Sequence, residues 1–213
     1  MHYQIISLDT WTRGNLFRFY IEQLRNVMSM TVDIDVTPLL SYIHEKGYKF
    51  YPTMMWIVSK VINHHDEFKY GWNENGELIL WDFVSPYYAD FHPEDEQFVK
   101  LVTEYDDDLS KFHARFMTDR ERYKNLRAFD LKNIPLNTFD VSCLPWIKYK
   151  SFDIHVFDEG KYLAPVVTWG KYERNNDRVL LPLSMNIHHA VADGYHLCRF
   201  FQEVQDLINN LKP

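Results

Sequence analysis

The order of apolar and polar positions along the chain predicts helices and strands that are interspersed. Strands are indicated where apolar residues alternate with polar ones, or where short apolar runs end in turn residues. They cover residues 3–8, 28–36, 68–72, 78–81, 87–91, 98–102, 138–144, 150–157, 165–173 and 179–188. Helices are indicated where apolar residues recur every three or four positions, within 17–24, 37–46, 54–62, 109–123 and 197–211.

Turn and cap residues mark the ends of several of these elements. Asn75-Gly76 predicts a hairpin between two strands, and Gly47 is a natural stop for the helix that begins at Thr37. Asp9 or Thr10 can cap the first helix. Many strands are joined by hairpin-type connections, so the pattern predicts an α+β fold, with a mixed, largely antiparallel sheet covered by helices. We expect one domain over residues 1–213.

Composition narrows the class of protein. The chain has 213 residues, of which 46% are hydrophobic, enough for a substantial core. A net charge of −7 argues against a nucleic-acid surface. Two cysteines give no disulfide framework, and neither a signal peptide nor a membrane-spanning run is evident, so a soluble, cytoplasmic protein is expected. His64-His65 suggests no metal site, because neighbouring side chains on a helix diverge.

The segment 186–196 carries the strongest chemical signal. Here an apolar run gives way to a helical pattern, so His188 and His189 are expected at the end of a buried strand, with Asp193-Gly194 forming the turn into the last helix. Strand alternation points adjacent histidines to opposite faces, and one can face the core while the other faces a cleft. A titratable imidazole with a carboxylate four residues on suits general-base chemistry. The alternative is a structural histidine satisfied within the core.

Arg13 falls in the first turn of a predicted helix, where the helix dipole does not favour a cation. An arginine in this place often has a carboxylate partner. A solvated surface arginine is the alternative at this point.

Residues His188 to Gly194 read His-His-Ala-Val-Ala-Asp-Gly, which resembles the His-His-x-x-x-Asp-Gly signature of the CoA-dependent acyltransferases. Plant acyltransferases and peptide-synthetase condensation domains are about twice this size, and dihydrolipoyl acyltransferase cores come attached to lipoyl and linker segments. The chloramphenicol acetyltransferase family has free-standing chains of this length. The resemblance to it covers nearly the whole chain, through residues 11–13, 48–52, 76–82, 142–146, 151–152, 164–168, 170–172 and 181–183.

The resemblance implies a role for each residue of a catalytic set. His189 resembles the general base that takes the proton from an acceptor hydroxyl, whose oxygen then attacks acetyl-CoA directly in a ternary complex. Ser142 matches the serine that stabilises the tetrahedral oxyanion, and Thr168 matches the threonine that assists through a water. Asp193 matches the aspartate that pairs with the arginine matching Arg13, which holds the histidine loop in position.

The resemblance also implies two binding regions and an assembly. Positions matching the chloramphenicol pocket are Phe19, Tyr20, Phe98 and Ile154. Positions matching the CoA side are Lys49, Tyr51, Lys171 and Tyr172. Acetyl-CoA is expected as co-substrate, without a metal. The family is a homotrimer whose sites lie between subunits, so three-fold self-association is expected here too.

Some positions depart from the family pattern. Ala192 stands where the family usually has cysteine, and Tyr195 where it has phenylalanine. Asp95-Glu96-Gln97 precedes Phe98 in place of a Thr-Glu-Thr run. The residues with chemical roles are kept, while positions near the pocket differ. The expected function is therefore O-acetylation of chloramphenicol; the alternatives are acetylation of another small alcohol or amine, and a non-catalytic binder.

Overall fold

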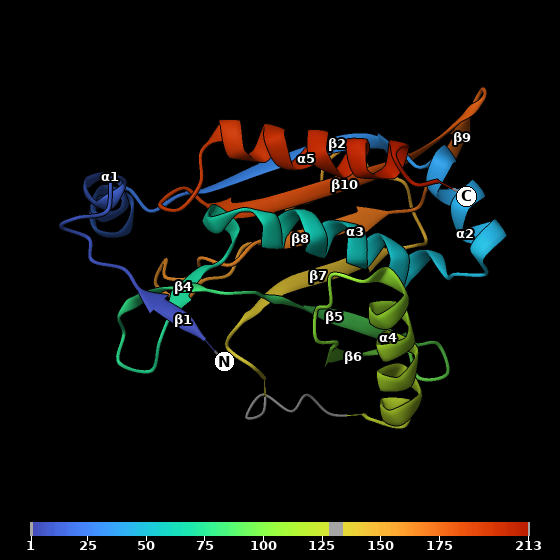
Figure 1. Ribbon diagram of the computed structural model, residues 1–213, viewed down its shortest axis with the longest axis horizontal. Helices are drawn as coiled ribbons and strands as arrows, with labels where there is room; N and C mark the ends of the chain where they lie inside the picture. The colour runs from blue at the N-terminus through green and yellow to red at the C-terminus, as the bar shows by residue number, and fades with distance from the viewer. Residues whose placement is uncertain (1, 128–133, 213) are drawn as a thin grey trace.

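One large mixed sheet dominates the fold, with helices packed against one of its faces (Figure 1). The computed structural model describes residues 2–127 and 134–212. The elements, in chain order, are β1 (Tyr3–Ile5), α1 (Gly14–Arg18), η1 (Phe19–Gln23), β2 (Val27–Asp35), α2 (Thr37–Lys46), α3 (Phe50–His64), η2 (Asp66–Phe68), β3 (Tyr70–Trp72), β4 (Leu78–Trp81), β5 (Ser85–His92), β6 (Gln97–Val102), α4 (Leu109–Tyr123), β7 (Thr138–Leu144), β8 (Val166–Gly170), β9 (Glu173–Asn175), β10 (Arg178–His188) and α5 (Gly194–Asn209).

The large sheet has the strand order β2-β10-β8-β7-β5-β6, with β9 beside β10. Strand β10 is antiparallel to β2 and β8, and β6 is antiparallel to β5. Strand β7 runs parallel to both β5 and β8. A smaller antiparallel sheet, β1-β4-β3, contains the hairpin predicted around Asn75-Gly76. The predicted α+β class with a mixed, largely antiparallel sheet is confirmed.

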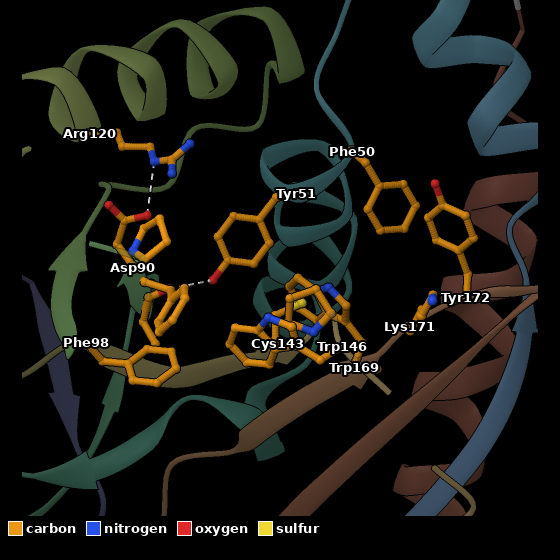
Figure 2. Close-up of a pocket in the computed structure, with 15 residues that line it drawn as sticks. Phe50, Tyr51, Asp90, Phe98, Arg120, Cys143, Trp146, Trp169, Lys171 and Tyr172 are labelled. Carbon is orange, nitrogen blue, oxygen red and sulfur yellow. Dashed lines mark hydrogen bonds and ion pairs between the residues drawn. The ribbon is translucent and has the colours of Figure 1, made fainter. Parts of the chain in front are cut away.

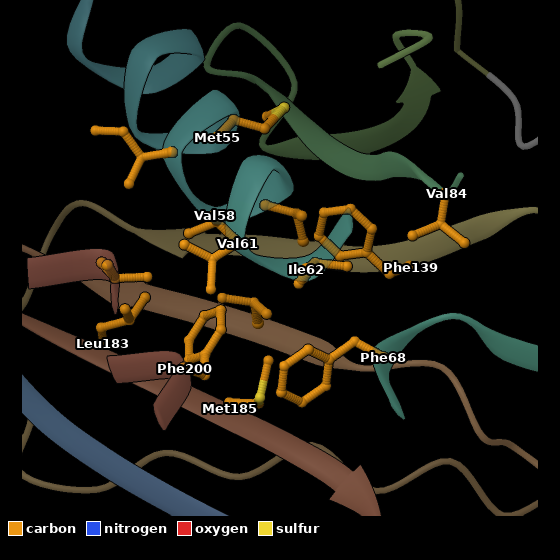
Figure 3. Packing of buried hydrophobic residues seen from close by; sticks show 14 of the residues in the cluster. Met55, Val58, Val61, Ile62, Phe68, Val84, Phe139, Leu183, Met185 and Phe200 are labelled. Atoms are coloured by element: carbon orange, nitrogen blue, oxygen red, sulfur yellow. The ribbon is translucent and has the colours of Figure 1, made fainter. Parts of the chain in front are cut away.

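The hydrophobic core lies between the large sheet and the helices α3, α4 and α5. Because side chains alternate along a strand, every second residue of β10, including Leu183 and Met185, faces these helices. Figure 3 shows these two side chains beside Val58 and Ile62 of α3 and Phe200 of α5. Helix α3 is buried on most sides, as its apolar composition predicts.

The opposite face of the sheet carries a row of hydroxyl groups across four adjacent strands. The backbone register aligns Thr31 with Ser184, Ser184 with Thr168, and Thr168 with Ser142. Residues 149–156 cross this face, where the Tyr149 hydroxyl donates to the carbonyl of Thr168 at 2.8 Å.

The prediction of a strand over 150–157 is wrong: the segment has no regular secondary structure. Asp153 bonds the side chains of Ser29 and Asn186, so side-chain contacts hold the segment to the sheet in place of a backbone ladder.

The first helix begins later than predicted. Neither Asp9 nor Thr10 caps it; Thr10 donates its hydroxyl to the Ser7 carbonyl, within a run of turns. Helix α1 starts at Gly14, where an added Cβ would lie 1.9 Å from the Leu8 carbonyl oxygen. The chain therefore passes too close to itself for any other residue, and one π-helical turn, η1, follows α1.

Within residues 2–127 and 134–212, no helix has the length and apolar content needed to cross a membrane.

Candidate active site

The loop between β10 and α5 holds His189 in a defined orientation. The His189 backbone N–H donates to the Asn26 carbonyl at 3.0 Å. Ring atom Nδ1 lies 2.9 Å from the Ala192 carbonyl oxygen and 3.3 Å from Oδ1 of Asp193. Both neighbours are acceptors, so Nδ1 carries the proton in the neutral ring. The lone pair then sits on Nε2, for which the described residues provide no hydrogen-bond partner.

Arg13 ties the loop together with four hydrogen bonds. Its two Nη atoms reach the Asp193 carboxylate, each at 2.7 Å, in a bidentate pair. Nε donates to the Ala190 carbonyl at 2.7 Å, and Nη2 also donates to the His189 carbonyl at 2.8 Å. The guanidinium lowers the pKa of Asp193. The carboxylate partner expected for Arg13 is therefore present. The alternative, a solvated surface arginine, is wrong.

An aromatic side chain covers one side of the catalytic candidate. The Tyr20 ring stacks on the His189 imidazole, with centroids 4.2 Å apart and planes inclined by 18°. Phe19 packs edge-on to Tyr20 and is exposed. Both aromatic residues come from η1, so the π-helical turn places the ring of Tyr20 against the loop.

His188 is buried and bonded to the backbone, which is typical of a structural histidine. It is 2% exposed, and its Nδ1 accepts a hydrogen bond from the backbone N–H of Ala190 at 3.1 Å. The side chain lies beside Ile154, under the segment that crosses the hydroxyl face, and burial lowers its pKa. One histidine of the pair is therefore buried, but His188 lies on the hydroxyl face of the sheet and not in the main core that the sequence suggested.

Ser142 and Thr168 lie side by side on β7 and β8 but do not meet His189 within one chain. Two strand spacings and five residues along β10 separate Ser142 from His189, about 19 Å in all. Thr168 is 1% exposed, and its Oγ1 has no hydrogen-bond partner in the described part of the chain. A buried hydroxyl without a partner is costly, so this atom is suited to a bound water or substrate group.

A cavity of about 740 Å³ opens on the helical side of the sheet (Figure 2). Aromatic and apolar side chains make up most of its wall. The lining residues are Phe50, Tyr51, Ala89, Asp90, Phe91, Pro93, Phe98, Arg120, Cys143, Pro145, Trp146, Trp169, Gly170, Lys171 and Tyr172. A volume of this size with a mostly apolar wall is typical of a small-molecule site.

Three of the four positions expected on the CoA side line this cavity: Tyr51, Lys171 and Tyr172. Tyr51 donates its hydroxyl to the Ala89 carbonyl at 3.0 Å, and burial raises the pKa of its phenol. The fourth, Lys49, immediately precedes Phe50, whose ring packs 5.3 Å from that of Tyr172. Three of the four positions therefore line one cavity, and Lys49 adjoins it in sequence.

The four positions expected in the acceptor pocket do not gather in one chain. Phe19 and Tyr20 stand beside His189, whereas Ile154 lies beside His188. Phe98 instead lines the large cavity and packs against Phe91 and Trp146.

Sequence patterns did not indicate the ion pair between Asp90 and Arg120 in the cavity wall. Asp90 alternates with apolar residues on β5 as any strand residue would, and Arg120 lies in a charged run on α4, so neither position carries a local signal.

No three His, Cys, Asp or Glu side chains come together as metal ligands in the described ranges. The thiol of Cys143 faces the cavity, and burial raises its pKa to about 12, so it is not a thiolate near neutral pH.

Similarity to known proteins agrees with this geometry. A sequence model of the chloramphenicol acetyltransferase family matches residues 1–205. A chloramphenicol acetyltransferase of Clostridium perfringens is 38% identical over 211 residues, covering 99% of this chain and 96% of the relative. Chloramphenicol acetyltransferase 3 of Escherichia coli is 37% identical, with 99% of both chains covered.

A solved chloramphenicol acetyltransferase shares the fold at a TM-score of 0.84 and 20% identity, covering 97% of this chain and all of that one. The sequence match extends over almost the full length of both proteins, and the chain belongs to the chloramphenicol acetyltransferase family.

Proposed function

We propose that this protein transfers the acetyl group of acetyl-CoA to a hydroxyl of chloramphenicol, with His189 as general base. The observation that carries the proposal is the orientation of the imidazole. Nδ1 is engaged by the Ala192 carbonyl, so the basic Nε2 is available to an acceptor hydroxyl. Family membership and the names of the relatives support the choice of chloramphenicol as acceptor.

The reaction proceeds in one ternary complex. Nε2 of His189 takes the hydroxyl proton as the oxygen attacks the thioester carbonyl, which forms a tetrahedral oxyanion. The Ser142 hydroxyl donates a hydrogen bond to that oxyanion, and such a donor contributes about 3–4 kcal/mol to lowering the barrier. Thr168 holds a water through its Oγ1, which has no partner among residues 2–127 and 134–212. Collapse then expels the CoA thiolate, which receives the proton from His189.

The remaining residues bind and position. Arg13 and Asp193 fix the loop that carries His189. Lys49, Tyr51, Lys171 and Tyr172 bind CoA, and the last three of them line the large cavity. Phe19, Tyr20, Phe98 and Ile154, which lie apart in one chain, line an acceptor pocket formed between subunits. The chain acts as one domain in the cytoplasm.

The site is completed by self-association. Ser142 and His189 of one chain are about 19 Å apart, too far to act on one carbonyl. A homotrimer in which His189 of one subunit faces Ser142 of the next brings both to the same substrate. Large hydrophobic side chains that are exposed in the single chain, including Phe157 at 96%, supply apolar surface for this association.

The test is release of CoA thiol from acetyl-CoA with and without chloramphenicol. Thiol release that depends on chloramphenicol, and is lost in His189→Ala while the oligomer is retained, supports the proposal. Consumption of acetyl-CoA with other small alcohols or amines but not with chloramphenicol would contradict the acceptor. Full activity of His189→Ala would contradict the assigned base.

A further inference from the structure

The lining of the large cavity includes two cationic side chains, in a protein whose net charge is −7. One is Lys171; Lys49 is not in the lining but directly precedes the lining residue Phe50 at the start of α3. The other is Arg120 of α4, to which the sequence and the family resemblance assigned no role. Figure 2 shows Arg120 on the opposite side of Tyr51 from Lys171 and Tyr172.

Asp90 orients Arg120 through a single atom of the Arg120 guanidinium, Nε. Nε of Arg120 donates to Oδ1 of Asp90 at 3.0 Å, and in the described residues neither Nη atom has a hydrogen-bond partner. The Asp90 side chain is 10% exposed, whereas that of Arg120 is 52% exposed. The buried carboxylate therefore fixes the direction of the side chain, while the two Nη groups remain open at the cavity.

Lys49 and Arg120 lie near two positions of α4 that are two turns apart. His113 and Arg120 lie seven residues apart on α4, which is two turns or about 10 Å. His113 accepts a hydrogen bond from the backbone N–H of Lys49 at 3.0 Å, so Lys49 lies near one end of this span and Arg120 at the other. Beneath them the wall is apolar, with Phe91, Trp146 and Trp169.

We propose that Arg120, oriented by Asp90, binds a phosphate group of coenzyme A at the mouth of the cavity and selects the nucleotide-bearing acyl donor. The inference rests on the proposed function, because it concerns the donor of that reaction. Arginine presents a planar fork that matches a phosphate, and its two free Nη groups can bind two oxygens at once. Arg120 is thus a specificity residue and Asp90 its positioning residue.

The experiment measures binding of CoA and of pantetheine, which has the same thiol arm but no phosphate, by calorimetry in the absence of any acceptor. Arg120→Met is expected to weaken CoA binding about 10- to 100-fold, the loss typical of a hydrogen bond to a charged group. Pantetheine binding should not change. Arg122→Met is the matched control, because it removes the same charge from an exposed position on α4 outside the cavity.

Asp90→Asn tests the positioning role. It should weaken CoA binding in the otherwise unchanged enzyme and have no further effect when combined with Arg120→Met. Equal weakening of CoA and pantetheine by Arg120→Met would overturn the inference, as would CoA binding that is unchanged. If the unaltered enzyme bound no CoA, the proposed function itself would fail, so the two failures are distinguishable.

Discussion

At the scale of single residues, the site depends on how one arginine is used. Arg13 directly precedes α1, yet all four of its side-chain hydrogen bonds go to residues 189–193. Two of these bonds end on the backbone carbonyls of His189 and Ala190. The guanidinium therefore fixes the backbone of the loop as well as the Asp193 carboxylate. The orientation of His189 therefore depends on a contact across 176 residues of sequence.

We expect Arg13→Met to impair both stability and turnover. The variant leaves Asp193 and two carbonyls without their donor in a partly buried site, so the free energy of unfolding should fall by about 1–3 kcal/mol. The rate constant kcat should fall more than the KM for the acceptor rises, because the imidazole loses its orientation. Chemical denaturation and steady-state kinetics provide the measurements. Arg13→Lys should recover only part of the loss, since lysine cannot make the bidentate pair.

The same pair predicts a pH dependence. Arg13 lowers the pKa of Asp193 in the folded protein, so the pair contributes its stability above the ordinary pKa of aspartate, about 4. That contribution is lost as the pH falls through the lower, folded-state pKa. The contribution of this pair to the Tm difference between the unaltered protein and Arg13→Met should therefore persist down to about pH 5 and shrink below about 4, whereas His196, whose pKa Arg13 also lowers, alters the difference at higher pH. A difference that disappeared already at pH 6 would point to a histidine instead.

At the scale of elements, the sequence predicted most strands and helices because their patterns are local. Strand β7 has the predicted bounds, and α2 ends at Gly47, which has φ +72°. The segment 150–157 shows what such patterns cannot reveal. Phe152, Ile154 and Val156 alternate as in a strand, but whether the backbone pairs depends on a neighbouring strand, which alternation does not encode.

The candidate site was predictable for a different reason. The proposed base His189 and its neighbour Asp193 belong to a motif with fixed spacing, whereas Asp90 and Arg120 meet only through packing of α4 on the sheet, 30 residues apart. Spacing along one chain also could not show that Ser142 and His189 are far apart within it.

Gly47 offers a test of how a helix end is specified. Its φ of +72° is left-handed, and an added Cβ would meet no atom within 4 Å. Gly47→Ala should therefore destabilise the protein through backbone conformation alone, by about 1 kcal/mol. Gly194→Ala is the control: that position is also free of contacts but has no positive φ, so stability should be unchanged or slightly higher. Thermal unfolding of both variants distinguishes the two effects, and equal Tm changes would contradict this account.

At the scale of the whole molecule, the decisive quantity is the distance between the proposed base, His189, and the proposed oxyanion donor, Ser142. In one chain the β-sheet register separates Ser142 from His189 by about 19 Å, and both belong to regular or tightly bonded structure. A hinge large enough to bring them together would have to break the sheet. Subunit association is the simpler way to complete the site, and it makes a prediction that no single-chain site shares.

Two inactive variants should therefore restore each other when their subunits are mixed. His189→Ala keeps Ser142, and Ser142→Ala keeps His189, so a site between one subunit of each kind, in the right order, has both groups. In a cyclic trimer assembled at random from equal amounts, each site has a chance of about one in four of receiving both. Co-refolding the two variants should recover about one quarter of the unaltered activity, far above the residual rate of either alone. Activity equal to the mean of the two separate variants would mean that each site is built within one chain, and the trimeric arrangement would have to be abandoned.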